Sequence, residues 1–237
     1  MNTILFDLDG TLLPLNNDDF EKAYFYALGK KFESLGLDKE SMIKAVWAGT
    51  VAMFENNGLK TNEDAFWDTF SALSKIPKDK IEKEFEQFYL NDFGFVKRIT
   101  SPTPFARQII AGLKEKGYTL VLATNPVFPK VATHQRIKWA GLDVSDFAYI
   151  TTYENFSYCK PDLAYYRELL VKINKTPGEC LMVGNDATED MIVSKLGIET
   201  FLFTDYLINT ENLDISSFRP GGWEDLIKLV NELPCLK

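Results

Sequence analysis

The sequence predicts an α/β fold, namely a Rossmann-like, doubly wound parallel sheet core with an inserted α-helical cap domain. Three observations carry this prediction: five short apolar runs, helical patterns between them, and one long interval that contains no strand. Strands that alternate with helices are typical of a parallel sheet with right-handed crossovers. The five apolar runs are Thr3–Phe6, Leu120–Ala123, Ala148–Ile150, Cys180–Val183 and Thr200–Phe203.

The first run, Thr3–Phe6, is rich in strand formers and stops at an acidic turn, Asp7–Thr11. We therefore expect a buried strand there. Gly117 and Gly197 stand where helices should end, because glycine readily adopts the left-handed conformation of a helix C-terminus. The residues that share a helical face are Phe105, Ile109, Ile110 and Leu113 in one segment, and Leu163, Tyr166, Leu170 and Ile173 in another.

Residues 15–95 interrupt the alternation, because they hold four amphipathic helical stretches and no convincing strand. Asn57-Gly58 and Pro77 mark turns between the helices. We expect a cap domain over 15–95 and a core domain formed by 1–14 and 96–237. Most cap aromatics should be core residues, with one or two lining a cleft, and Trp47–Thr50 is the stretch expected to face it. These aromatics are Phe20, Tyr24, Trp47, Phe54, Phe66 and Trp67. The apolar helical positions are Phe20, Tyr24, Ala27, Leu28 and Phe32; Met42, Val46 and Met53; Phe66, Phe70 and Leu73; and Ile81, Phe85 and Phe88.

The composition is that of a soluble protein with a full core, since 46% of the 237 residues are hydrophobic and 25% are charged. A net charge of −8 disfavours nucleic acid and anionic lipid as partners. The three cysteines lack paired spacing, and we find neither a signal peptide nor an apolar stretch of about 20 residues. We expect a cytoplasmic protein without a membrane partner, either a monomer or a homodimer.

Four polar clusters stand at the ends of predicted strands or at the start of a following helix. The carboxyl ends of parallel strands lie at one edge of a sheet, so residues far apart in sequence can form one site there. The clusters are Asp7 with Asp9, Thr124 with Asn125, Cys159-Lys160-Pro161, and Asn185-Asp186 with Asp190.

The residue types at this edge suit phosphoryl transfer. Asp7 can attack phosphorus while Asp9 carries a proton to the leaving oxygen, which splits hydrolysis into two easier steps. Thr124 and Asn125 can donate hydrogen bonds to phosphate oxygens, and Lys160 can neutralise the transferring group and orient Asp7. We expect the thiol of Cys159 to be inert rather than reactive.

Asp186 and Asp190 supply the hard oxygen ligands that Mg²⁺ prefers, with substrate phosphate and water completing the octahedron. Carboxylates at this point could also cap a helix N-terminus, and the two roles are compatible. A bound cation and one lysine would make the site attractive to a phosphorylated metabolite despite the net negative charge.

The chain resembles the haloacid dehalogenase (HAD) superfamily, whose four motifs are matched in order by Asp7–Thr11, Thr124, Lys160 and Gly184–Asp190. The resemblance covers essentially the whole chain and implies a helical C1-type cap that selects the substrate. It also implies that Asp7 is the nucleophile and Asp9 the acid/base. By the same resemblance, Asp7, the Asp9 carbonyl and Asp186 are the magnesium ligands.

The fourth motif departs from many relatives, which place an aspartate directly after the glycine where this chain has Asn185. Two arrangements are therefore open. Either Asp186 binds the metal and Asp190 supports it from behind, or Asp190 binds the metal with help from Asn185. We favour Asp186.

Asp9 bears on the type of reaction. The founding dehalogenases lack an acidic residue at this position, because displacing halide from carbon needs no proton for an alkoxide. The expected function is a Mg²⁺-dependent phosphatase that hydrolyses a small organic phosphate monoester, such as a sugar phosphate, phosphoglycolate or a nucleoside monophosphate, through an aspartyl-phosphate. The alternatives are a phosphomutase, a 2-haloacid dehalogenase, or a non-catalytic binding protein on the same scaffold.

Overall fold

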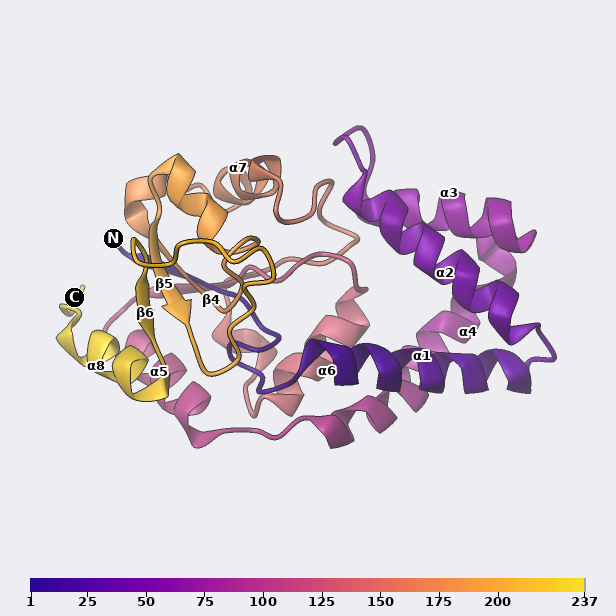
Figure 1. Cartoon of the computed structure of the whole chain (residues 1–237), viewed down its shortest axis with the longest axis horizontal. Helices are drawn as coiled ribbons and strands as arrows, with labels where there is room; N and C mark the ends of the chain where they lie inside the picture. Colours follow the sequence, from indigo (N-terminus) through magenta and orange to yellow (C-terminus); the bar gives the residue numbers. More distant parts are fainter. Residues whose placement is uncertain (237) are drawn as a thin grey trace.

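A six-stranded parallel sheet forms the centre of the core (Figure 1). The structure, a computed structural model, describes residues 1–236. All five predicted strands are confirmed, whereas β6 was not predicted because Arg219-Pro220-Gly221 lacks apolar strand formers. In sheet order the strands are β3 (Tyr149–Ile150), β2 (Thr119–Leu122), β1 (Thr3–Phe6), β4 (Cys180–Gly184), β5 (Glu199–Phe203) and β6 (Arg219–Gly221).

Helices cover both faces of the sheet, which explains why the central strands β1 and β4 are buried throughout. Leu5 of β1 packs into a cluster with α7, whereas its neighbours Ile4 and Phe6 pack into the cluster that contains α5 and α8. Both predicted core helices, α5 and α7, are confirmed. The core helices are α5 (Pro104–Glu115), α6 (Lys130–Trp139), α7 (Leu163–Lys172) and α8 (Trp223–Glu232), with 3₁₀ helices η2 (Val144–Asp146), η3 (Pro177–Glu179) and η4 (Met191–Leu196).

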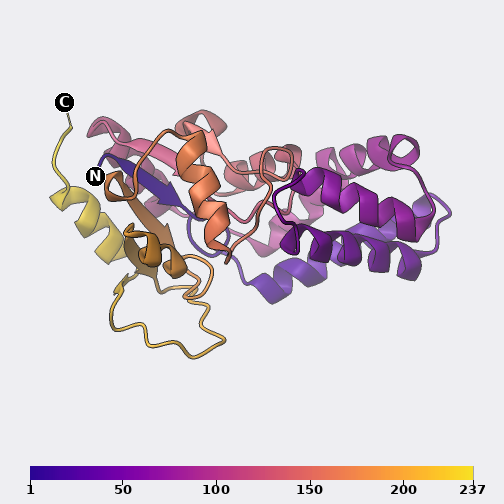
Figure 2. The ribbon, with the colours of Figure 1, turned by 90° about the horizontal axis from the view of Figure 1, so that it is seen from above.

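Four cap helices lie at the end of the molecule opposite to the start of β1 and to α8 (Figure 2). Three of them begin where a side-chain oxygen of Asn16, Asp38 or Thr61 accepts a backbone N–H of the first turn. The four helices fall within the predicted range 15–95, and the borders of a cap domain stay a prediction. The helices are α1 (Asn17–Ser34), α2 (Lys39–Phe54), α3 (Asn62–Ser74) and α4 (Lys78–Leu90), followed by the 3₁₀ helix η1 (Asp92–Ile99).

One apolar helical position of the cap, Leu73, was expected to be buried and is not. Leu73, in the last turn of α3, is 55% exposed, because the buried residues of this helix end at Phe70. Trp47 and Phe54 are about half exposed, in agreement with the expectation that one or two cap aromatics line a cleft. No helix within residues 1–236 is both long and apolar enough to cross a bilayer.

The order of the strands places a site at one edge of the sheet. The chain runs from β1 outward to β2 and β3 on one side, then returns to β4, β5 and β6 on the other. Open α/β sheets bind ligands at the carboxyl ends of the strands beside such a reversal. In this protein the reversal lies between β1 and β4, which are followed by the loops that begin at Asp7 and Asn185.

Candidate active site

Lys160 lies between two buried carboxylates at this edge of the sheet. Its Nζ is 3.0 Å from Asp7 Oδ1 and 2.6 Å from Asp190 Oδ1. Both Lys160 and Asp190 are 1% exposed. Burial alone would lower the pKa of Lys160, but the charges of Asp190 and Asp7 outweigh it and hold the pKa well above its usual value. The ammonium group is therefore charged and lies beside Asp7, and its role in orienting this carboxylate stays a prediction.

The turn after β1 is held by contacts to the loop after β4. Thr11 Oγ1 donates to Asn185 Oδ1 at 3.1 Å and lies 3.4 Å from Asp7 Oδ2. Gly10 has a φ of +77°, and a Cβ at this position would lie 2.3 Å from Asn185 Nδ2. Only glycine fits this turn, because a side chain would be both strained and in collision.

Most side-chain polar atoms of Asn185, Asp186 and Asp190 in the fourth motif make hydrogen bonds within the described part of the chain, and one carboxylate oxygen does not. Both side-chain groups of Asn185 are engaged, since Nδ2 also donates to the Tyr206 carbonyl at 2.7 Å. Both oxygens of Asp190 are engaged as well, one with Lys160 and one with the Asp186 backbone N–H at 3.0 Å. Asp186 Oδ1 accepts the N–H groups of Thr188 and Glu189, whereas its Oδ2 makes no hydrogen bond within residues 1–236. Of these three side chains, Asp186 retains a free carboxylate oxygen.

The expected helix after this motif is shorter than the sequence suggested. Asp186 closes a turn through its two backbone contacts, and only the six-residue 3₁₀ helix η4 follows. Gly197, at a φ of 84°, ends it.

Asp9 contacts a residue that the sequence analysis missed. Arg136 of α6, 1% exposed, donates from Nη1 to Asp9 Oδ2, and its guanidinium lies 4.5 Å from the centre of the Phe128 ring. The other oxygen of Asp9 is buried without a partner among the described residues. Burial raises the pKa of Asp9 to about 6 with help from Asp7, although Arg136 and Lys160 oppose the shift. A group with such a pKa can both release and accept a proton near neutral pH.

Arg136 carries no clear signal in the sequence, because Lys130–Trp139 shows little apolar periodicity. It occupies the buried face of α6 together with Ala132, Thr133 and Ile137. A charge buried in this way requires a partner, which is Asp9.

Thr124 and Asn125 follow β2, as predicted. Thr124 is buried and lines the cleft described below. The side chain of Asn125 accepts the Lys160 backbone N–H at 3.2 Å and donates to the Lys160 carbonyl at 3.3 Å and to Glu189 Oε2 at 3.0 Å. Asn125 thus positions the backbone of Lys160, a contact that was not predicted. Phosphate binding by Thr124 and Asn125 stays a prediction.

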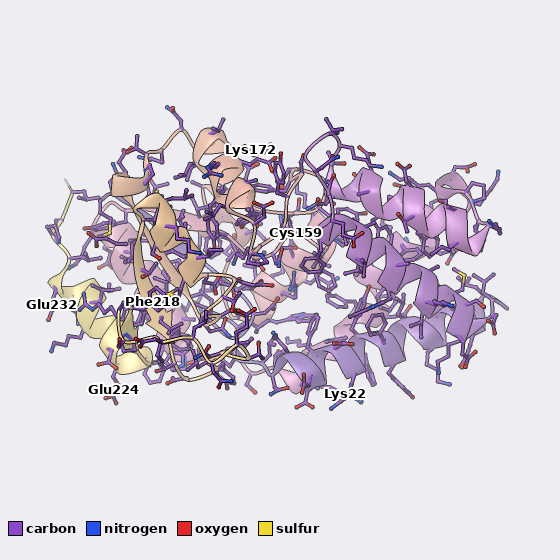
Figure 3. All side chains as sticks on the ribbon, turned by 45° about the horizontal axis from the view of Figure 1, so that its top comes forward. Lys22, Cys159, Lys172, Phe218, Glu224 and Glu232 are labelled. Atoms are coloured by element: carbon purple, nitrogen blue, oxygen red, sulfur yellow. The ribbon has the colours of Figure 1, made fainter. Side chains whose placement is uncertain are left out.

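A cleft of about 1040 Å³ separates the sheet edge from the cap helices. Asp7, Asp9 and Asp186 line its floor, and Trp47 and Thr50 line its cap side, so the expected cleft-facing stretch is confirmed at these two positions. Cys159, next to Lys160, lies where the core meets the cap (Figure 3), and Asn62 of α3 donates to its Sγ at 3.4 Å. Burial raises the pKa of this thiol, in agreement with an inert cysteine.

The donor set fits a hard cation. Within residues 1–236, no three Asp, Glu, His or Cys side chains converge closely enough to hold a metal ion by themselves. Mg²⁺ does not require this, because it commonly binds one or two carboxylates and completes its shell with water and substrate phosphate. Asp7 and the free oxygen of Asp186 are carboxylates of this kind in one cleft.

The chain is similar to known hydrolases in sequence and in fold. The family model of haloacid dehalogenase-like hydrolases matches residues 1–195. A phosphoglycolate phosphatase of Aquifex aeolicus is 25% identical over 98% of this chain and 97% of its own length. The pyrophosphatase PpaX of Anoxybacillus flavithermus is 25% identical over 82% of this chain and 79% of its own length. The crystal structure of a HAD phosphatase from Thermococcus onnurineus has a TM-score of 0.60 at 19% identity, with 97% of this chain and 98% of that one covered.

Proposed function

The chain belongs to the haloacid dehalogenase-like hydrolase family, and on this premise we propose that it is a magnesium-dependent phosphatase acting on small organic phosphate monoesters. The observation that carries the proposal is the contact of 3.0 Å between the buried Lys160 Nζ and Oδ1 of Asp7, which lines the cleft. A fixed ammonium beside a carboxylate neutralises charge on a phosphoryl group that reacts there.

Asp7 attacks phosphorus, and the bond between phosphorus and the leaving oxygen breaks. Asp9 gives its proton to that oxygen, so an alcohol departs and an aspartyl-phosphate remains on Asp7. Asp9 then takes a proton from water, whose oxygen attacks phosphorus and releases inorganic phosphate and free Asp7. Asp190 and Asn125 hold Lys160 in place, and Arg136 fixes the direction of Asp9.

Asp7, the backbone carbonyl of Asp9 and Asp186 would hold Mg²⁺. Bound Mg²⁺ lowers the repulsion between an anionic nucleophile and an anionic substrate. Asp186 is favoured over Asp190 as the second carboxylate because both oxygens of Asp190 already have partners.

Phosphate release from a panel of phosphorylated metabolites, with purified protein and Mg²⁺, tests the proposal. Turnover of one or more esters is expected. Absence of turnover across the panel would favour a non-catalytic binding protein, and chloride release from 2-haloacids would favour a dehalogenase. A phosphoenzyme that persists in water but decays on addition of a sugar phosphate would favour a phosphomutase.

Mg²⁺ should stabilise the folded protein in the absence of substrate. At a concentration of 100 Kd a ligand adds about 2.7 kcal/mol, which raises Tm by roughly 5–10 °C in a chain of this size. Differential scanning calorimetry of chelator-treated protein, with and without Mg²⁺, measures this shift. Asp186→Asn should lose most of it, whereas the exposed control Asp79→Asn should keep it. An unchanged shift in Asp186→Asn would assign the metal to other ligands.

Asp9→Asn should lower kcat by roughly 10²–10⁴-fold, because the amide cannot deliver a proton to the leaving oxygen. The first-turnover release of alcohol, followed by rapid quench, isolates this step. The loss should be large for alkyl phosphates and small for nitrophenyl phosphate, whose leaving group needs no proton. Equal losses for both kinds of ester would contradict the role of Asp9 as the acid.

A further inference from the structure

The cleft is larger than a phosphoryl group and its metal require. Its volume, about 1040 Å³, lies just above the roughly 300–1,000 Å³ typical of sites for drug-sized ligands. On the proposed mechanism the phosphoryl group lies against Asp7 in the lining of the cleft, so the remaining space belongs to the leaving group. Much of that space is bounded by the cap helices.

One face of α2 lines this space. Trp47, Thr50 and Phe54 all line the cleft at a spacing of three and then four residues, which places them on one side of the helix. Trp47 is 50% exposed and Phe54 is 47% exposed. Phe25 of α1 lies beside Trp47, with ring centres 5.8 Å apart. Large aromatic rings left open to a cleft offer a stacking surface for another flat ring.

The charges on the cap side disfavour a second anionic group. The acidic residues that line the cleft from the cap helices are Glu21, Glu63, Glu82 and Glu86. Against them the cap helices supply Lys83 in the lining and Lys78, which lies 2.8 Å from Glu63 and 3.5 Å from Glu82.

The core side of the cleft supplies cations from α6. Lys130 and Lys138 are exposed, so solvent screens their charge, and Arg136 is paired with Asp9. A carboxylate or second phosphate on the leaving group would therefore meet a cap wall of net negative charge.

Glu154 supplies a buried hydrogen-bond acceptor in the lining of the cleft, next to Tyr153, whose carbonyl accepts the backbone N–H of Glu63 in the cap. Glu154 lines the cleft, and its Oε1 accepts the Lys130 backbone N–H at 2.8 Å. Its Oε2 is buried and has no partner among residues 1–236. A buried acceptor of this kind gains a hydrogen bond when a ligand offers an N–H or O–H group.

We infer that the preferred substrates are phosphate monoesters of an uncharged alcohol that carries a flat heteroaromatic ring, the chemistry of a nucleoside 5′-monophosphate. This inference rests on the proposed phosphatase function and names its substrate class. The ring stacks on the Trp47 and Phe54 face of α2, and donor groups of the leaving alcohol reach Glu154.

Relative kcat/KM values test the inference. Nucleoside 5′-monophosphates should exceed glycerol phosphate by tenfold or more, and phosphoglycolate and pyrophosphate should be the poorest substrates. Phenyl and pyridoxal phosphates form a second arm, which separates recognition of any flat ring from recognition of a nucleoside. Stacking of a base on an aromatic residue is worth about 1–3 kcal/mol, so Trp47→Ala should lower the ratio of nucleotide to glycerol phosphate about tenfold. Trp47→Phe should restore most of it.

Tyr26→Ala is the matched control, because Tyr26 is also half exposed on a cap helix but lies outside the cleft, stacked on Phe95. It should leave the ratio unchanged. A wild-type preference for glycerol phosphate or phosphoglycolate would overturn the inference, as would an unchanged ratio in Trp47→Ala.

Failure of the proposed function gives a different result, namely no phosphate release from any ester, aliphatic or aromatic. Binding then decides the inference. Calorimetry with Asp7→Asn should show nucleoside monophosphates binding at least tenfold more tightly than glycerol phosphate. Equal affinities would overturn the inference whatever the turnover.

Discussion

Asp7→Asn is expected to abolish phosphatase activity, with kcat lowered by roughly 10⁴-fold or more. An amide oxygen is a poor nucleophile, so no aspartyl-phosphate forms. The side chain keeps its size, and Lys160 keeps its contact of 2.6 Å to Asp190, so the fold should be preserved. Phosphate release at saturating Mg²⁺, together with acid-quench trapping of labelled phosphoenzyme in the wild type, measures both the loss and its cause.

The control for this variant is Asp79→Asn, which makes the same chemical change at an exposed position of α4 outside the cleft. It should retain full activity. Near-normal, Mg²⁺-dependent phosphate release by Asp7→Asn would refute the proposed mechanism, because another group would have to be the nucleophile.

Lys160→Met should lose both activity and stability. Asp7 and Asp190 would then share a buried site without a cation, and breaking a buried pair in this way costs about 3–5 kcal/mol. For a chain of this size, Tm should fall by roughly 6–20 °C. Urea unfolding followed by circular dichroism measures the change in free energy.

A second substitution separates the two effects. Lys160→Met with Asp190→Asn removes the uncompensated charge, and the amide can still accept the Asp186 backbone N–H. The double variant should recover most of the lost stability and none of the activity. Recovery of turnover in the double variant would show that Lys160 supports activity only by stabilising the fold. If Lys160→Met alone caused no loss of stability, Asp7 and Asp190 would not form a buried charged cluster with Lys160.

Much of the fold follows from local patterns. Five of the six strands contain a run of apolar residues, so β1, β2, β3, β4 and β5 could be located from the sequence. The cap helices could be located because their apolar spacing matches one helical face, and side chains such as Asp38 mark where they begin. The edge strand β6 lacks such a pattern and escaped prediction.

The sequence by itself determined that Asp7, Lys160 and the fourth motif would meet, because the carboxyl ends of parallel strands lie at one edge of a sheet. Only the tertiary structure decided which atoms are engaged there: Asp190 with Lys160, Asn185 with the first loop, and Arg136 with Asp9. The tertiary structure also shows that the Trp47 side chain lines the cleft and that about half of it is exposed. Periodicity fixes the face on which a side chain lies, but its partners depend on how separate elements pack together, and no local pattern encodes that geometry.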